Sequence, residues 1–180
     1  MKPLLAVLLA AVAASAAWTE LDLSVRADPD GFSSIKEEHL ALDLTGTQTT
    51  ARRWSFRGKA GGQNYELTAT PVRRMDADEL VQGWRFTAEN LDGVLEPTSR
   101  WRADYRLTGS GPSVTFQSES SSNDAEFLVR SPEFQLRTRT AAGRSQLTGG
   151  GQDVDAKRAA LLGASLILLK LDPPRRTARR

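Results

Sequence analysis

A strict alternation of apolar and polar residues recurs in short stretches along most of this 180-residue chain. In residues 21–25, for example, leucine and valine alternate with aspartate and serine. Successive side chains of a β-strand point to opposite faces of the sheet, so a period of two predicts strands with one buried and one solvated face. The same alternation occurs in residues 40–45, 53–57, 84–89, 101–108 and 114–117.

Turn-forming residues separate these stretches. Clusters of glycine, proline, asparagine and aspartate lie at residues 28–31, 60–64, 109–112 and 149–151. Strands with one wet and one dry face, joined by short turns, are typical of antiparallel sheets. The chain is therefore predicted to be all-β, as an elongated antiparallel β-jelly-roll or a sandwich-like sheet.

A looser pattern, apolar-x-small followed by another apolar residue, returns at residues 65–72, 85–95, 126–134 and 154–161. Repeated strand-like units favour the stacking of one supersecondary unit on the next, as in a solenoid or an elongated sheet. Such stacking often leaves an apolar groove. The serine-rich stretch 118–122 is predicted to be a mobile loop.

The N-terminus has the features of an export signal. Lys2 gives a positive start, residues 4–12 are apolar without interruption, and residues 13–17 are small. This pattern predicts a signal peptide over residues 1–17, cleaved after Ala16 or Ala17, and a periplasmic or secreted protein. A retained anchor is the alternative, although the apolar run is shorter than the roughly 20 residues needed to span a bilayer.

One β-domain is expected over residues 18–172. The chain has no cysteine, so disulfides cannot stabilise this domain and the core must do so alone. The formal net charge is +2. This near balance argues against a nucleic-acid-binding protein, which would carry a clustered basic excess.

Two interpretations are open for residues 155–171. Their alanine and leucine content favours a helix, which Asp153 or Asp155 could cap. Gly163 interrupts the segment, however, and residues 154–162 resemble the repeated strand units, which favours two strands joined near Gly163. Residues 173–180 are predicted to form a frayed basic tail, with contact to anionic lipid headgroups as the functional alternative.

No catalytic or metal-binding motif stands out. His39 is the only histidine, and it follows two glutamates in what is expected to be a solvated turn. The nucleophile elbow and the phosphate-binding loop are both missing from the sequence, and the usual zinc ligands are too few. The protein is therefore predicted to act without enzymatic activity, cofactor or metal. A hydrolase with acids brought together only by folding is the remaining alternative.

Seven aromatic residues on the predicted dry faces are the main functional candidates. In an ordinary fold they would form the core; if the sheets stay open, they would line an apolar groove for acyl chains. These lipid-binding candidates are Trp54, Phe56, Trp84, Phe86, Trp101, Tyr105 and Phe116.

Several phrases resemble the repeated strands of the OstA-like proteins, the periplasmic lipopolysaccharide-transport family. They are residues 84–91, residues 65–69, and the strand-ending Leu-Thr-Gly of residues 44–46 and 107–109. The resemblance implies a twisted β-jelly-roll, a lipid-carrying groove and edge-to-edge docking between β-domains. It transfers no individual site residue.

The leading hypothesis is thus an exported, non-enzymatic protein that binds or transports a lipid or glycolipid in an apolar β-groove. The alternative is a structural or interaction module of the cell envelope that pairs with another β-protein through a sheet edge. A nucleic-acid partner is not expected.

Overall fold

The computed structural model describes residues 18–49, 52–119, 126–141, 144–152 and 154–178. The predicted signal peptide, residues 1–17, and residues 120–122 of the predicted serine-rich loop lie outside these ranges.

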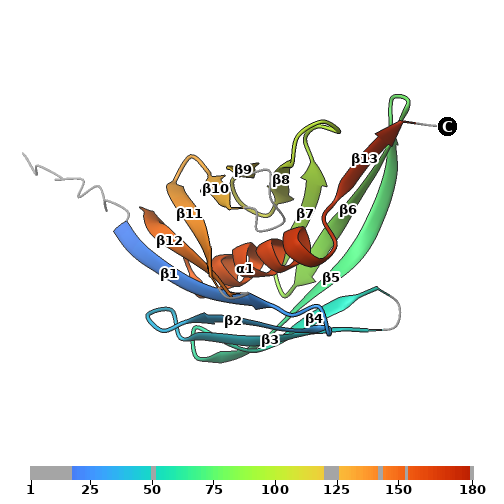
Figure 1. The fold of residues 1–180 in the computed structure, drawn as a ribbon. Helices are drawn as coiled ribbons and strands as arrows, with labels where there is room; N and C mark the ends of the chain where they lie inside the picture. The colour runs from blue at the N-terminus through green and yellow to red at the C-terminus, as the bar shows by residue number, and fades with distance from the viewer. Residues whose placement is uncertain (1–17, 50–51, 120–125, 142–143, 153, 179–180) are drawn as a thin grey trace, which may run out of the picture.

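Twelve strands follow one another along the chain before the single described helix (Figure 1). They are β1 (Trp18–Ala27), β2 (Phe32–Glu37), β3 (Leu42–Gln48), β4 (Trp54–Ala60), β5 (Gln63–Asp76), β6 (Glu79–Ala88), β7 (Leu91–Pro97), β8 (Asp104–Gly109), β9 (Val114–Ser118), β10 (Phe127–Arg130), β11 (Phe134–Ala141) and β12 (Arg144–Gln152).

The twelve strands form a closed antiparallel barrel. Each strand pairs with its neighbour in sequence, and β1 also pairs with β12, from Trp18 opposite Gln152 to Arg26 opposite Arg144. The prediction of an all-β antiparallel fold is confirmed. The prediction of a jelly-roll or sandwich is wrong, because one continuous sheet closes on itself. Alternation along a strand is the same in both architectures and does not reveal whether the first and last strands meet.

Helix α1 (Ala156–Leu171) fills the barrel (Figure 1). Every residue from Ala159 to Leu169 is buried, so all sides of the helix are covered. The prediction of two strands for this segment is wrong, because residues 156–171 form one continuous helix. A helix that is buried all round shows no 3.6-residue periodicity, and its continuous apolar run cannot be distinguished from a buried strand by pattern.

Local signals fix both ends of α1. An Asp155 side-chain oxygen accepts a hydrogen bond from the Arg158 backbone N–H at 2.7 Å, as expected of an N-cap. At the other end, the Asp172 N–H donates to the Leu168 carbonyl oxygen at 2.9 Å. Pro173 and Pro174 then prevent the helix from continuing.

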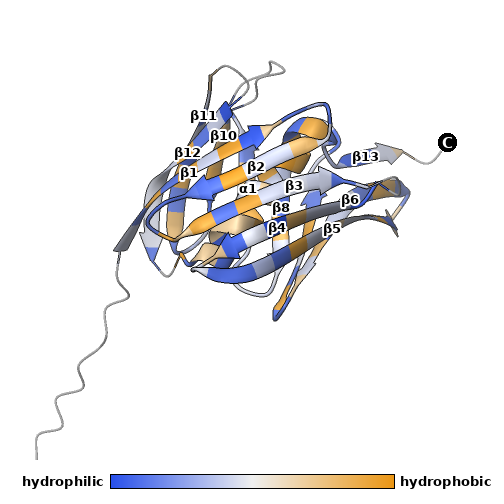
Figure 2. Cartoon of the chain, turned by 90° about the horizontal axis from the view of Figure 1, so that it is seen from below, coloured by the Kyte–Doolittle hydropathy of each residue, from blue (hydrophilic) through white to orange (hydrophobic). Residues whose placement is uncertain are grey.

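The inward faces of the strands and the helix form one core. Apolar and polar residues alternate along the strands in Figure 2, as the period of two predicts. Leu23, Leu44, Leu67 and Phe86 are fully buried, in one cluster with the leucines of α1. No helix within the described ranges is long and apolar enough to cross a membrane.

A short last strand, β13 (Arg175–Ala178), pairs with the outer half of β6, from Arg175 opposite Gln82 to Ala178 opposite Glu79. It occupies the side of β6 that β7 leaves free, because β7 pairs only with residues 84–88 of β6. The predicted frayed tail is therefore wrong for these four residues, which belong to the barrel sheet.

Gly163 allows α1 to pack closely against β2. A Cβ atom at this position would lie 2.6 Å from Cγ2 of Ile35. We expect Gly163→Ala to lower the free energy of unfolding by about 1–2 kcal/mol, because overpacking exceeds the gain of about 1 kcal/mol in helix propensity. Denaturant unfolding of the variant measures this loss.

The same contact predicts coupling between the two positions. When Gly163→Ala is combined with Ile35→Ala, the added methyl group occupies space that the isoleucine vacates, and the losses should fall short of additivity by about 1 kcal/mol. Leu147→Ala on β12 is the control and should add fully. Additive losses for the Ile35 pair would show that the close approach does not limit this site.

Candidate functional site

Six of the seven aromatic candidates lie in the core. Their exposed fractions are 8% or less, and they belong to the same cluster as the apolar side chains of α1. They therefore fill the barrel together with the helix and do not line the open groove expected for them. The six are Trp54, Phe56, Trp84, Phe86, Tyr105 and Phe116.

The seventh candidate, Trp101, lies outside the core. It was predicted to begin a strand, but β8 starts only at Asp104, and Trp101 belongs to the loop between β7 and β8. Its side chain is 80% exposed, and the Arg100 guanidinium carbon lies 4.2 Å from the centroid of its ring. An exposed tryptophan stacked with arginine is an unusual surface feature, and it makes this end of the barrel a candidate binding site.

A small pocket lies close by, at the C-terminal end of α1. Arg52 reaches it from the segment between β3 and β4, Arg73 from β5, and Arg175 from β13. Gln82 and Trp84 also line it. Its volume is about 110 Å³. We call the pocket formed by these five residues the arginine pocket.

Strand register assembles the arginine pocket. Gln82 of β6 lies opposite Arg73 on one side and opposite Arg175 on the other. Direct cross-strand partners point to the same face, and neighbouring strands are about 4.8 Å apart, so the two arginines flank Gln82 on one face of the sheet. This is also the face on which Trp84 points into the barrel, two residues further along β6.

The arginine pocket carries an excess of positive charge. None of its three arginines forms an ion pair with an acid in the described part of the chain. Among the residues that the structure describes, Asp172 is the one carboxylate that lines the pocket. The C-terminus of α1 adds about half a negative charge. Three positive charges thus face about one and a half negative charges, and the pocket is suited to an anion.

Trp84 ties the pocket wall to the helix. Its indole Nε1–H donates a hydrogen bond to the Asp172 carbonyl oxygen at 2.9 Å. This bond satisfies one of the carbonyl groups left free where a helix ends. It also holds the turn of Pro173 and Pro174, which leads directly into Arg175.

A second hollow continues from the arginine pocket and shares Arg175 and Pro174 with it. Trp101, Arg102 and Tyr105 line this hollow, whose volume is about 360 Å³. Burial raises the pKa of the Tyr105 hydroxyl, so this group stays protonated and can act as a hydrogen-bond donor. We call this hollow the Trp101 groove.

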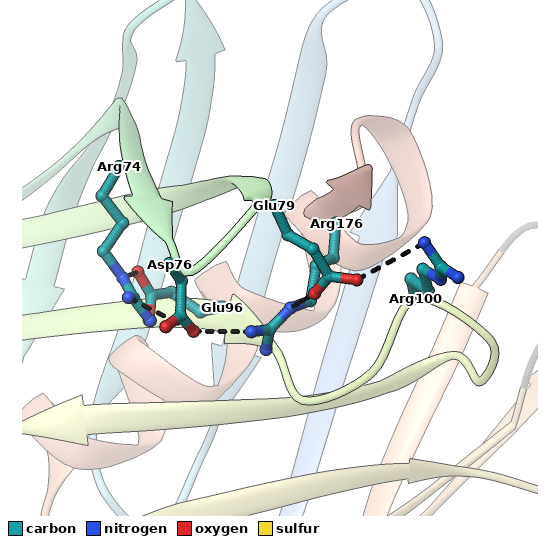
Figure 3. A network of polar contacts seen from close by, with 6 residues as sticks. All are labelled: Arg74, Asp76, Glu79, Glu96, Arg100 and Arg176. Carbon is teal, nitrogen blue, oxygen red and sulfur yellow. Dashed lines mark hydrogen bonds and ion pairs between the residues drawn. The ribbon is translucent and has the colours of Figure 1, made fainter. Parts of the chain in front are cut away.

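A chain of alternating charges lies on the opposite face of the same sheet region (Figure 3). Arg74 binds Glu96 through two nitrogens, at 2.7 and 2.9 Å, and Asp76 at 3.6 Å. Arg176 continues the chain from Asp76, at 2.5 Å, to Glu79, and Arg100 closes it 3.6 Å from Glu79. Hydrogen bonds to Glu79 and Glu96 raise the pKa values of Arg176 and Arg74, respectively.

The charge chain positions both parts of the site. It fastens β13 to β6 through Arg176, and its neighbour Arg175 then points to the other face and into the arginine pocket. It also holds Arg100, on which Trp101 stacks. Sequence reasoning missed this arrangement, although the doublets Arg73-Arg74 and Arg175-Arg176 carry the signal: in a strand, adjacent arginines point to opposite faces.

His39, the polar candidate from the sequence, lies in a turn that a carboxylate caps. The Glu37 carboxylate accepts the Leu40 backbone N–H at 2.5 Å and thereby caps the turn that contains the exposed His39. Among the described residues, no group of three or more acidic, histidine or cysteine side chains could hold a metal ion.

Comparisons with protein-family models, with curated proteins and with solved structures find no match to this chain. The resemblance to the OstA-like proteins therefore depends on the sequence phrases alone, and the interpretation of the site depends on its geometry.

The charge chain makes a testable prediction about β13. Glu79→Gln removes the carboxylate shared by Arg176 and Arg100, so amide exchange of residues 175–178 should become several-fold faster while the unfolding midpoint changes little. Glu66→Gln is the matched control, because Glu66 forms a cross-strand ion pair with Arg57 at 2.8 Å, on β4 and β5. Equal exchange of residues 175–178 in Glu79→Gln and the parent would show that the charge chain does not hold β13.

Proposed function

We propose that this protein is an exported, non-enzymatic binding protein of the cell envelope that holds the anionic headgroup of a lipid or glycolipid in the arginine pocket. The observation that carries the proposal is that Arg52, Arg73 and Arg175 line one small pocket and form no ion pair within the described part of the chain. Unpaired arginines at one place cost stability through mutual repulsion, and a bound anion would relieve that cost.

The chemistry of the arginine pocket suits a compact oxyanion. A guanidinium group presents its donors as a planar fork that matches phosphate and carboxylate oxygens. A volume of about 110 Å³ accommodates a single such group and leaves the rest of the ligand outside. Gln82 adds a neutral donor between the two arginines that flank it.

Exposed apolar side chains beside the pocket favour an amphiphilic ligand. Trp101 is 80% exposed, and Met75, on the same face of β5 as Arg73, is 52% exposed. Tryptophan is well suited to the boundary between water and an apolar phase, because its ring is apolar and its N–H is polar. In this proposal Trp101 and Met75 contact the apolar part of the lipid, while the arginines hold its headgroup.

The proposal places the ligand at the mouth of the barrel. Helix α1 occupies the interior, so the acyl chains of a bound lipid would stay outside. The lipid partner expected from the sequence is retained, but its expected site, a groove lined by the seven aromatic residues, is replaced. Export rests on the sequence pattern of residues 1–17.

A second candidate function is docking through a sheet edge. Strand β13 ends the sheet, and the edge that does not pair with β6 borders the Trp101 groove. Backbone groups alternate in direction along a strand, so half of those in β13 point away from β6 and could pair with an added strand.

Sedimentation with lipid vesicles tests the headgroup proposal. The full chain should bind phosphatidylglycerol vesicles and not phosphatidylcholine vesicles, and the binding should weaken as salt is raised. Arg73→Gln and Arg175→Gln should each weaken binding about fivefold, since an arginine near an anionic surface contributes about 1 kcal/mol. Arg130→Gln, an exposed arginine at the end of β10, is the matched control and should bind as the parent does.

Three outcomes would contradict the proposal. Equal binding to both vesicle types would show that the headgroup is not recognised. Equal losses in Arg130→Gln and Arg73→Gln would show that overall charge acts and not the pocket. If neither vesicle type binds, edge docking through β13 becomes the better explanation of this surface.

A further inference from the structure

A different cavity lies at the opposite end of α1 and shares no residue with the arginine pocket. It is enclosed by the first turns of the helix, the β6–β7 turn and the β8–β9 turn. Its volume is about 250 Å³. The proposed headgroup site does not account for it.

One part of the lining of this cavity is apolar. It consists of Leu91, Leu107, Val114, Leu161 and Leu162. All but Leu91 are at most 6% exposed, and they belong to the core cluster. These five side chains offer no hydrogen bond, so the part of a ligand that lies against them must itself be apolar.

The lining holds one buried polar atom that needs explanation. The Nη2 atom of Arg158 is buried without a well-formed hydrogen bond, but it lies 2.9 Å from the Glu133 carboxylate in an ion pair. Its charge is thus already balanced. The Arg158 guanidinium also lies 5.0 Å from the centroid of the Phe134 ring. Arg158 therefore does not provide a site for an anion.

The rim of the cavity disfavours a negatively charged headgroup. Asp92 lies 4.0 Å from Arg85. The rim charges without such an ion pair are Glu89, Asp155 and Lys157, with a sum of −1, of which the N-terminus of α1 offsets about half. Lys157 also lies over the Tyr65 ring, at 5.9 Å. Neutral donors and acceptors are available at the rim from Asn90, and they suit a hydroxyl or ester group.

We infer that this cavity binds the end of a single alkyl chain that carries an uncharged polar group, such as an alcohol or an ester. An apolar cavity of about 150 Å³ in a protein core can hold benzene. The present cavity is larger and can hold one extended or bent chain, but not two. The inference is independent of the arginine pocket, and either can hold when the other fails. We call the cavity the alkyl pocket.

Titration of the full chain with 1-alkanols from butanol to decanol, followed by calorimetry, tests this inference. Affinity should rise about fourfold with each added methylene group and level off when the alkyl pocket is full. Octanoate, which matches octanol in chain length and adds a charge, should bind at least several-fold more weakly at low salt, because the rim is negative.

Gly93→Ala locates the binding. A Cβ atom at Gly93 would lie 3.4 Å from Cδ1 of Leu107 and 3.7 Å from Cδ2 of Leu161, so it fits in the wall of the cavity without a clash. This variant should remain folded and bind octanol several-fold more weakly, with the plateau at a shorter chain. Lys157→Gln is the control for the rim: it should bind octanol as the parent does and octanoate even more weakly.

Several results would overturn the inference. Alkanols that do not bind to saturation, or that bind Gly93→Ala and the parent equally, would show that the cavity is not their site. Octanoate that binds as tightly as octanol would overturn the uncharged headgroup. A peptide that carries one octanoyl ester, tested beside free octanol, distinguishes the two sources of such a chain. Tighter binding of the peptide points to a chain on a partner protein, and tighter binding of octanol points to a free lipid.

Discussion

The packing of one apolar helix inside a closed ring of strands is the constraint on which the rest of this structure depends. A barrel of about eight strands is just wide enough for side chains to fill, and twelve strands enclose more space than their own side chains occupy. Protein interiors are packed without large voids, so the space needs a further element. An α-helix with its side chains is about 10–12 Å across and can supply it. Helix α1 therefore has to be apolar on every side, and Gly163 has to be small where Ile35 approaches.

This arrangement also decides where ligands can bind. Because α1 seals the interior, the aromatic side chains of β4, β6, β8 and β9 contribute to stability and not to a binding groove. Hollows remain at the two mouths, where the helix ends and the strands continue. At one mouth the sheet extends past Asp172. There β13 brings Arg175 opposite Gln82 of β6, which on its other side lies opposite Arg73 of β5. At the other mouth two turns surround the first residues of the helix and leave a cavity that is apolar on one side. The two ends differ in chemistry: one has three arginines without an ion pair among the described residues, and the other combines leucine and valine side chains with a polar rim.

Sequence reasoning succeeded where the signal was local. The period of two identified β1, β3, β4, β6, β8 and β9, because each of these strands has one buried and one solvated face. It failed for residues 156–171, since burial on all sides removes the periodicity that marks a surface helix. Trp101 was misplaced because the alternation of residues 101–108 begins before β8 does. The arginine pocket could not be found in this way. Arg52, Arg73 and Arg175 are far apart in sequence and meet only through the register of β5, β6 and β13 and the loop before β4. Three of the four predicted turns, at residues 28–31, 60–64 and 109–112, lie where one strand ends and the next begins, but the fourth is wrong: residues 149–151 belong to β12 and pair with β1 and β11. Turns also do not specify which strands meet at closure.

Native-state hydrogen exchange of the full chain tests the central claim, that α1 is the interior of the barrel and not a cover on its surface. If the helix is enclosed by all twelve strands, it cannot unfold without opening the barrel. Amides of residues 160–169 should then exchange as slowly as the most protected amides of β1 to β4 and only through global unfolding, with the same dependence on denaturant. Exchange of these helix amides through a local opening, faster than that of the strands and independent of denaturant, would show that the helix can leave the barrel and would contradict its place as the sealed interior.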